Sequence, residues 1–281
     1  MDIFAVTPMS QDIELEAGKT YEASILVSNP ANATKNFTYQ VTVSPYSVTG
    51  SDYAADLLTL SNRSEITKWI KIEEPSGTLA PNESKKIKFT ISVPETAPSG
   101  GQYAALLVSG RGEGQDGDGV TINSVLEIAS IVFANVEGET IHEGEIVDNA
   151  IPGLVFSTPI TVGATLENKG NVHEAAEVFL TVKNSFTGET IYPKGDELNG
   201  IREIIMPETT RYLTREVSEV PALGVFEITQ EVFYLGEKSI ETKTVFDCPL
   251  WFVILTIFTI GAIIGTVLAK IKKKRSRLKI A

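Results

Sequence analysis

The chain has 281 residues, of which 36 are acidic, 24 are basic and two are histidine, so its formal net charge is −12 at pH 7. Seven of the basic residues lie in residues 270–281, which leaves a net charge of −19 (17 basic against 36 acidic) on everything before them. A region this acidic repels polyanions, so we expect no nucleic-acid partner.

The only cysteine of the chain, Cys248, excludes an internal disulfide. Apolar cores must therefore hold the fold, and the length permits this at about 100–150 residues per domain. An exported region without disulfides favours a bacterial or archaeal surface over animal immunoglobulin domains.

Residues 1–136 contain short runs in which apolar and polar residues alternate, separated by turn residues. This period of two predicts strands with one buried face. The runs are 21–28, 36–44, 66–72, 84–93, 102–109 and 120–136. Because no helical segment separates them, they predict an antiparallel immunoglobulin-like β-sandwich over residues 1–136. We expect Trp69 in its core and Tyr103 either in the core or as a corner tyrosine.

The one long loop of this region is GRGEGQDGDG, residues 110–119. Its side chains Glu113, Asp116 and Asp118 offer carboxylates of the kind that Ca²⁺ takes on a flexible turn. Their spacing is not that of a complete calcium loop, so an ordinary solvated turn is the other reading. We expect no cofactor or metal, with Ca²⁺ at these three residues left open.

Residues 137–247 repeat the alternating pattern without an evident sequence duplication, and they predict a second immunoglobulin-like β-sandwich. The expected strands are 156–166, 175–183, 201–206, 210–216 and 226–235. Gly170 is expected to take a positive φ in a connection between strands, and Leu235-Gly236 to form a hairpin turn. From residue 239 to 248 the chain is expected to leave this domain for the membrane.

Residues 249–269 form an uncharged stretch of 21 residues. As a helix it would be about 30 Å long, the thickness of the bilayer hydrocarbon, so residues 248–269 are predicted to form one transmembrane helix. Gly261 and Gly265 would let another helix approach closely, which leaves homo-oligomer formation open.

The basic tail, residues 270–281, sets the predicted orientation. Its cations are Lys270, Lys272, Lys273, Lys274, Arg275, Arg277 and Lys279. By the positive-inside rule the tail lies in the cytoplasm and residues 1–248 lie outside. Because MDIFAVTPMS has no basic n-region and no apolar stretch, this orientation implies a signal peptide removed before residue 1. The alternative is a tail-anchored protein with the opposite orientation.

No catalytic motif is evident. The sequence has no G-x-S-x-G elbow, P-loop, H-E-x-x-H pair or dinucleotide fingerprint. His142 and His173 are about 30 residues apart and would lack a cysteine to complete a metal site, so we expect ordinary surface histidines. We expect no enzyme and no catalytic residues.

Three segments of the first region carry a family resemblance: WIKI at 69–72, GTLAPNES at 77–84 and VPETAPSGGQYAA at 93–105. In these segments the chain resembles the WxL-interacting proteins of Gram-positive bacteria. Its plan of two sandwiches, one C-terminal helix and a short basic tail is similar to theirs. The resemblance implies an adhesive or scaffolding role, with a secreted WxL-domain protein and peptidoglycan as ligands.

We therefore expect a membrane-anchored cell-surface scaffold that presents two β-sandwich domains to an envelope protein, with membrane lipid around its helix. Strand addition at a sheet edge of the first domain is the expected mode of docking. One alternative is a structural subunit of a larger membrane or envelope assembly, joined through the helix. A second alternative is a calcium-dependent carbohydrate or peptidoglycan binder that uses loop 110–119.

Overall fold

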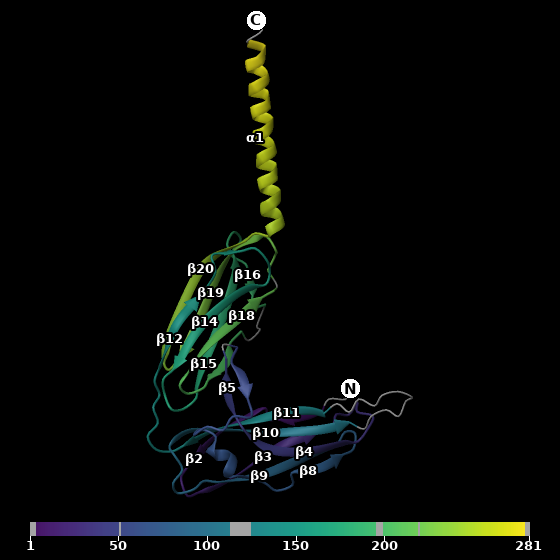
Figure 1. The fold of residues 1–281 in the computed structure, drawn as a ribbon, viewed down its shortest axis with the longest axis vertical. Coiled ribbons are helices and arrows are strands. Elements are labelled where there is room, and N and C mark those ends of the chain that lie inside the picture. Colours follow the sequence, from purple (N-terminus) through teal and green to yellow (C-terminus); the bar gives the residue numbers. More distant parts are fainter. Residues whose placement is uncertain (1–3, 51, 113–124, 195–198, 219, 279–281) are drawn as a thin grey trace. The chain divides into compact units, whose positions relative to one another are not determined.

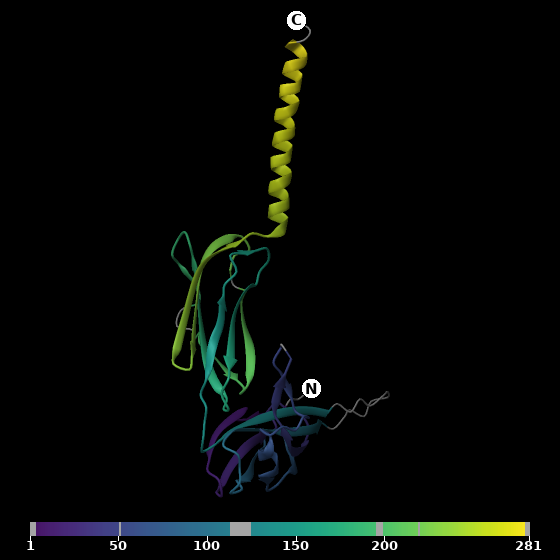
Figure 2. The same cartoon turned by 60° about the vertical axis from the view of Figure 1, so that its left-hand side comes forward.

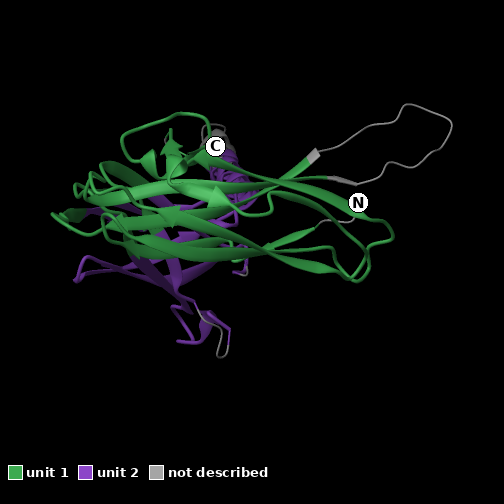
Figure 3. Cartoon of the chain, turned by 90° about the horizontal axis from the view of Figure 1, so that it is seen from below, with its two compact units in different colours: residues 1–145, 167–175, 204–211 green, residues 146–166, 176–203, 212–281 purple. Residues whose placement is uncertain are grey.

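The computed structural model describes residues 4–50, 52–112, 125–194, 199–218 and 220–278. Strands account for most of the regular structure, and one helix stands at the C-terminal end (Figures 1 and 2). The chain divides into two compact units (Figure 3). Unit 1 comprises residues 1–145, 167–175 and 204–211, and unit 2 comprises residues 146–166, 176–203 and 212–281.

Unit 1 contains two facing sheets. The four-stranded sheet has the order β1 (Ala5–Thr7), β3 (Thr20–Ser28), β9 (Ser84–Ser92), β7 (Ile70–Ile72). The five-stranded sheet has the order β2 (Ser10–Leu15), β11 (Val125–Val136), β10 (Gly100–Gly112), β4 (Phe37–Pro45), β8 (Ser76–Leu79). A short pair, β5 (Ser47–Thr49) with β6 (Ala54–Asp56), and the 3₁₀ helix η1 (Glu65–Lys68) complete it.

One apolar core fills the space between these two sheets, because side chains alternate between the faces of each strand. The four-stranded sheet contributes Val27 and Ile91, and the five-stranded sheet contributes Leu106 and Val132, all fully buried. Trp69 lies in the same core, as expected. The two sheets thus form a β-sandwich of the predicted immunoglobulin-like class, within a unit that also includes residues 137–145, 167–175 and 204–211.

Unit 2 also has two sheets. The smaller has the order β12 (Gly144–Ala150), β14 (Ile160–Asn168), β18 (Thr209–Val217). The larger has the order β13 (Leu154–Val155), β20 (Glu237–Asp247), β19 (Gly224–Tyr234), β15 (Glu174–Asn184), β16 (Thr190–Tyr192), and β17 (Ile201–Ile205) also pairs with β15. Ile160 and Val162 of the smaller sheet share a core with Leu180, Ile228 and Val245 of the larger.

The helix α1 (Leu250–Leu278) contains a segment, Leu250–Ile271, that is long and apolar enough to cross a membrane. Its threonine hydroxyls bond back to the helix itself. Thr256 Oγ1 donates to the Phe252 carbonyl at 2.8 Å, and Thr266 Oγ1 donates to the Ile263 carbonyl at 2.8 Å. These bonds satisfy polar groups that would otherwise face an apolar surrounding.

Two predicted elements differ from the structure. The run 66–72 forms η1 followed by the short β7, because the Trp69 N–H donates to the Ile66 carbonyl at 2.9 Å and closes a tight turn. That turn places Ile66 in the core without a strand. Residues 239–248 do not leave the sheet early: β20 extends to Asp247. Its alternation is obscured by Lys243, which occupies an inward position.

Of the two expected glycine turns, only one has the predicted geometry. Leu235 and Gly236 have φ of 48° and 79° and join β19 to β20 as a hairpin, as expected. Gly170 is not among the residues with positive φ. A Cβ at Gly170 would instead collide with the Ile141 carbonyl oxygen, so glycine is needed there for close backbone approach.

Candidate functional site

The last strand of unit 1, β11, is paired along its whole length on one side only. Residues 125–136 pair with β10, whereas on the other side β2 begins at Ser10 opposite Ile131 and covers 131–136. Residues 125–130 therefore have no partner strand on that side within the described part of the chain. We call this stretch the open edge.

The backbone groups that face outward along the open edge follow from the hydrogen bonds just beyond it. The Ile131 N–H donates to the Met9 carbonyl at 2.9 Å, and the Glu137 N–H donates to the Leu15 carbonyl at 2.8 Å. The backbone N–H and C=O groups of odd-numbered residues of β11 therefore point away from β10. Because this direction alternates along a strand, the same holds for Val125, Glu127 and Ala129. Their N–H and C=O groups are directed at the position of a missing strand.

Side chains of the open edge alternate between the core and the outer face. Leu126 and Ile128 point inward and pack against the core, yet each stays only half-buried. Glu127 and Ala129 point to the outer face, where Glu127 is exposed. Backbone donors and acceptors beside incompletely covered apolar side chains are the requirements for adding a strand.

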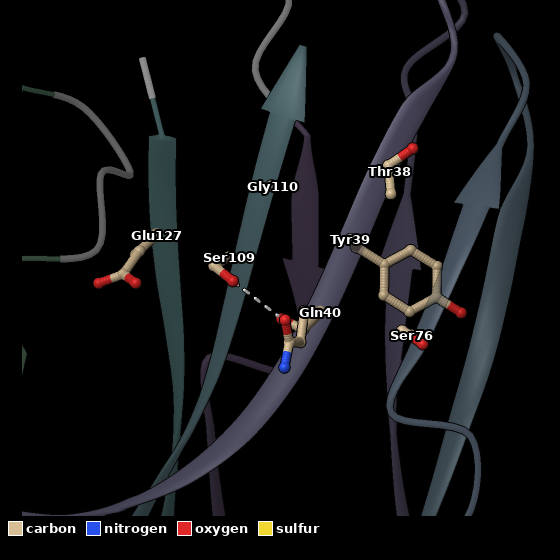
Figure 4. Close-up of a pocket in the computed structure, with 7 residues that line it drawn as sticks. All are labelled: Thr38, Tyr39, Gln40, Ser76, Ser109, Gly110 and Glu127. Carbon is tan, nitrogen blue, oxygen red and sulfur yellow. Dashed lines mark hydrogen bonds between the residues drawn. The ribbon is translucent and has the colours of Figure 1, made fainter. Parts of the chain in front are cut away.

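A polar hollow of about 390 Å³ is lined by residues of β8, β4 and β10 and reaches the open edge only at Glu127. Figure 4 shows its lining: Thr38, Tyr39, Gln40, Ser76, Ser109, Gly110 and Glu127. Ser109 Oγ donates to the Gln40 carbonyl at 3.3 Å. The Tyr39 side chain belongs to the core between the sheets, and burial raises the pKa of its hydroxyl. Because β10 and β4 lie on the other side of β11, Glu127 is the one described residue of this lining that borders a peptide running along the edge.

The other half of the same outer face is covered within unit 1. Phe133 packs against Tyr103 and His173, with ring centroids 6.0 Å and 5.0 Å away. Met206 and partly buried Tyr46 belong to the same apolar cluster. Burial raises the pKa of the Tyr103 hydroxyl, which keeps it neutral. Tyr103 is buried, as expected, but it belongs to this outer cluster and not to the core between the sheets.

Strand β20 is the corresponding last strand of unit 2, and its edge is protected. The short β13 pairs only with Phe246 and Asp247, so residues 237–245 lack a partner strand on that side among the described residues.

Lys243 shares the inward face with buried Val245, and its Nζ donates to the Ile151 carbonyl at 2.9 Å. Asn149 Nδ2 donates to Ser239 Oγ at 3.1 Å. An inward charge on an edge strand opposes pairing with another chain.

The two histidines form no common metal site. His142 Nδ1 lies 2.6 Å from a Glu174 carboxylate oxygen, and His173 Nε2 lies 3.1 Å from an Asp12 carboxylate oxygen. His173 is largely buried and therefore not the surface residue that we expected. No cluster of three or more possible metal ligands occurs among the described residues.

The other predicted site residues do not contribute to the open edge. Glu113, Asp116 and Asp118 lie outside the described residues. Gly261 and Gly265 stand on α1 with nothing within 4 Å of an added Cβ. The basic residues from Lys270 to Arg277 continue α1, and Lys279 lies outside the described part of the chain.

The sequence predicted strand addition in the first domain without locating the strand. It missed β2, although Ile13 and Leu15 of SQDIEL alternate with polar residues. Pro8, just before β2, was the signal that this strand is separated from β1.

No family model matches the chain, and no curated protein matches it. Solved structures that are similar include the class 5 fimbriae chaperone CfaA (TM-score 0.41, 13% identity, covering 86% of this chain and 99% of that one). Another is a Salmonella enterica SafA pilin in complex with the SafB chaperone (TM-score 0.41, 12% identity, 88% and 98% covered). A third is the Escherichia coli chaperone DraB (TM-score 0.39, 11% identity, 86% and 97% covered). This likeness is limited to the β-sandwich architecture.

These findings correct two expectations. Membership of the WxL-interacting proteins is wrong, since the similar structures are chaperones of the fimbrial type and no family model matches. The membrane-anchored surface scaffold is withdrawn with it, together with its two alternatives, because the similar structures include fimbrial and periplasmic chaperones. The motifs that suggested the family are turn and strand signatures that many β-sandwiches share.

Proposed function

We propose that the chain is a non-catalytic, polypeptide-binding protein that holds an extended segment of its partner on the open edge. The observation that carries the proposal is the unpaired half of β11. A strand added there would bond to the outward groups of Val125, Glu127 and Ala129 and extend the five-stranded sheet. Its alternate side chains would cover Leu126 and Ile128 on one face and lie beside Glu127 on the other.

The partner is expected to present a segment with alternating apolar residues. Main-chain bonds give affinity for any extended chain, whereas the half-buried Leu126 and Ile128 select apolar side chains at every second position. Glu127 carries the one charge among the described residues that line the hollow, so a basic residue beside it should be favoured. Such segments are exposed in polypeptides that have not completed their own sheets.

We further propose that the two units are tandem immunoglobulin-like domains and that α1 crosses a membrane. The positive-inside rule supports a cytoplasmic basic tail, with both units on the opposite side. Membrane lipid would then surround Leu250–Ile271. Binding of Ca²⁺ by Glu113, Asp116 and Asp118 is not part of this function.

An array of 12-residue peptides from secreted proteins of the same cell, probed with full-length protein in detergent micelles, tests the function. The tightest peptide is then added in a hydrogen-exchange measurement. We expect exchange of the Glu127 and Ala129 amides to slow, while that of the Thr244 amide on β20 stays unchanged. Protection on β20 alone, or no protection of β11, would overturn the proposal.

A further inference from the structure

Exposed apolar side chains gather at one end of unit 2, where β20 ends. They are Leu154, Phe156, Phe186, Leu223 and Phe246, which are between 48% and 82% exposed. We call these five residues the apolar rim. Large apolar residues exposed together are uncommon on a surface that faces only water.

Strand pairing places the rim residues at the same end of the larger sheet. Leu154 is paired with Phe246, and Gly224, the residue after Leu223, is paired with Asp247. The turn that carries Phe186 follows β15, and its Ser185 N–H donates to the Val225 carbonyl at 3.0 Å. Phe156 directly follows β13. The rim therefore comes from four chain segments that end side by side.

The apolar helix begins immediately beyond this end. Only Cys248 and Pro249 separate β20 from α1, and the Cys248 N–H donates to the Val155 carbonyl at 2.9 Å. Two linking residues span no more than about 10 Å, so the helix begins within that reach of the end of β20, where Phe246 of the rim lies. That turn carries exposed Trp251, a residue type enriched where a membrane meets water.

Charge is missing from the rim in an otherwise acidic protein. Residues 153–158, 185–188 and 221–224 contain no Asp, Glu, Lys or Arg. Asp247, the acidic residue next to the helix, is 1% exposed, and burial raises its pKa. The turn at the opposite end of β20 carries exposed Glu237 and Lys238 instead. Only the end next to the helix is suited to an apolar, negatively charged bilayer surface.

We propose that the apolar rim inserts into the interface of the bilayer that α1 crosses. Phe156, Phe186 and Leu223 would sit among the lipid headgroups and the first carbons of the acyl chains, as the apolar faces of interfacial helices do. The lipid surface is the occupant that chain continuity dictates, because the helix holds the rim beside it. This inference rests on the membrane crossing proposed above and not on the function of the open edge.

Depth-dependent quenching tests the inference with the full-length chain. In a Cys248→Ser background, single cysteines replace Phe186, Leu223, Phe258 of the helix, or Glu237 at the far turn, and each carries an environment-sensitive fluorophore. The variants are placed in phosphatidylcholine–phosphatidylglycerol vesicles with or without brominated lipid. We expect quenching at 186 and 223 to exceed that at 237 at least about threefold, and quenching at 258 to be strongest.

The four positions separate the possible failures. Strong quenching at 258 with none at 186 and 223 would overturn the rim insertion while membrane crossing stands. No quenching at 258 would overturn both. An emission shift at 186 that depends on protein concentration, without quenching by lipid, would show that a second copy covers the rim and would also overturn the proposal. The four labelled positions are exposed and Cys248 is only partly buried, so the substitutions leave the core intact.

Discussion

The last strands of the two units, β11 and β20, are paired in the same way, but their unpaired edges carry different side chains. Each is paired fully on one side, and each is covered on the other by a parallel strand only near its C-terminal end. The uncovered parts differ at inward positions, which include Ile128 in β11 and the charged Glu241 and Lys243 in β20. We therefore expect inward charge to determine whether an edge accepts another chain.

The largest expected effect comes from proline on the open edge. Ala129→Pro removes an outward N–H and leaves the bonds to β10 in place, since proline is tolerated where the N–H faces away from the sheet. We expect the tightest array peptide to bind at least about 30-fold more weakly, measured by fluorescence anisotropy. Thr244→Pro, at an outward position of β20, is the matched control and should leave binding within about twofold. Equal losses in both variants would contradict the comparison.

A lysine at the inward position should make β11 resemble β20. Ile128→Lys places a charge where the partner's side chains would pack, while its stem can reach solvent past the edge. We expect about tenfold weaker peptide binding with an unchanged far-ultraviolet circular dichroism spectrum. Ile128→Val keeps the apolar surface and serves as the control. Peptide binding that survives the lysine would show that the inward face plays no part.

The reverse change should make β20 able to pair. Lys243→Ile removes both the inward charge and the hydrogen bond to the Ile151 carbonyl. We expect self-association about fivefold stronger than in the parent chain, measured by sedimentation velocity in detergent. Lys238→Ile, on the solvent face of the same strand, is the control and should change association little. A monomeric Lys243→Ile variant would mean that the segment around Asn149 protects β20 by itself.

The smallest expected effect concerns Asp247, whose carboxylate oxygens are buried without a hydrogen-bond partner among the described residues. Burial raises its pKa above the ordinary 3.8. Folding is therefore favoured when this carboxyl is protonated, and that contribution is lost as the pH rises through the folded-state pKa. Asp247→Asn should raise the free energy of unfolding by about 1 kcal/mol at pH 7 and by almost nothing below pH ~4. Thermal denaturation at both pH values checks this, and a gain independent of pH would refute the assignment.

Most of the β architecture could be predicted from the sequence, because Ile, Val, Phe and Leu alternate clearly in the long central strands. Strands β3, β4, β9 and β10 are of this kind. Edge elements were harder to recognise, since edge strands carry the polar residues that keep them from pairing. β2 and β20 were missed for this reason: SQDIEL has only two apolar residues, and the inward face of β20 carries Glu241 and Lys243.

The sequence predicted the mode of docking, strand addition, but not the strand at which it takes place. The sandwich class predicts that a strand could be added at a sheet edge. Which edge is open depends on where β2 starts opposite β11. That register is set by contacts between residues more than 100 positions apart, such as the hydrogen bond from Ser130 Oγ to the Pro8 carbonyl. The carboxylates of loop 110–119 drew attention because of their chemistry alone. Composition does not show which edge of a sheet remains unpaired.

The junction between β20 and α1 also determines how unit 2 responds to mechanical load. The Phe246 N–H donates to the Gly153 carbonyl at 3.0 Å and the Cys248 N–H donates to the Val155 carbonyl at 2.9 Å, directly before the helix. A pull on α1 therefore acts along β20 and loads these two bonds, and then the ladder to β19, lengthwise. Bonds loaded together in this way resist more force than bonds opened one after another. The junction would transmit tension from the helix into the sheet before any strand separates.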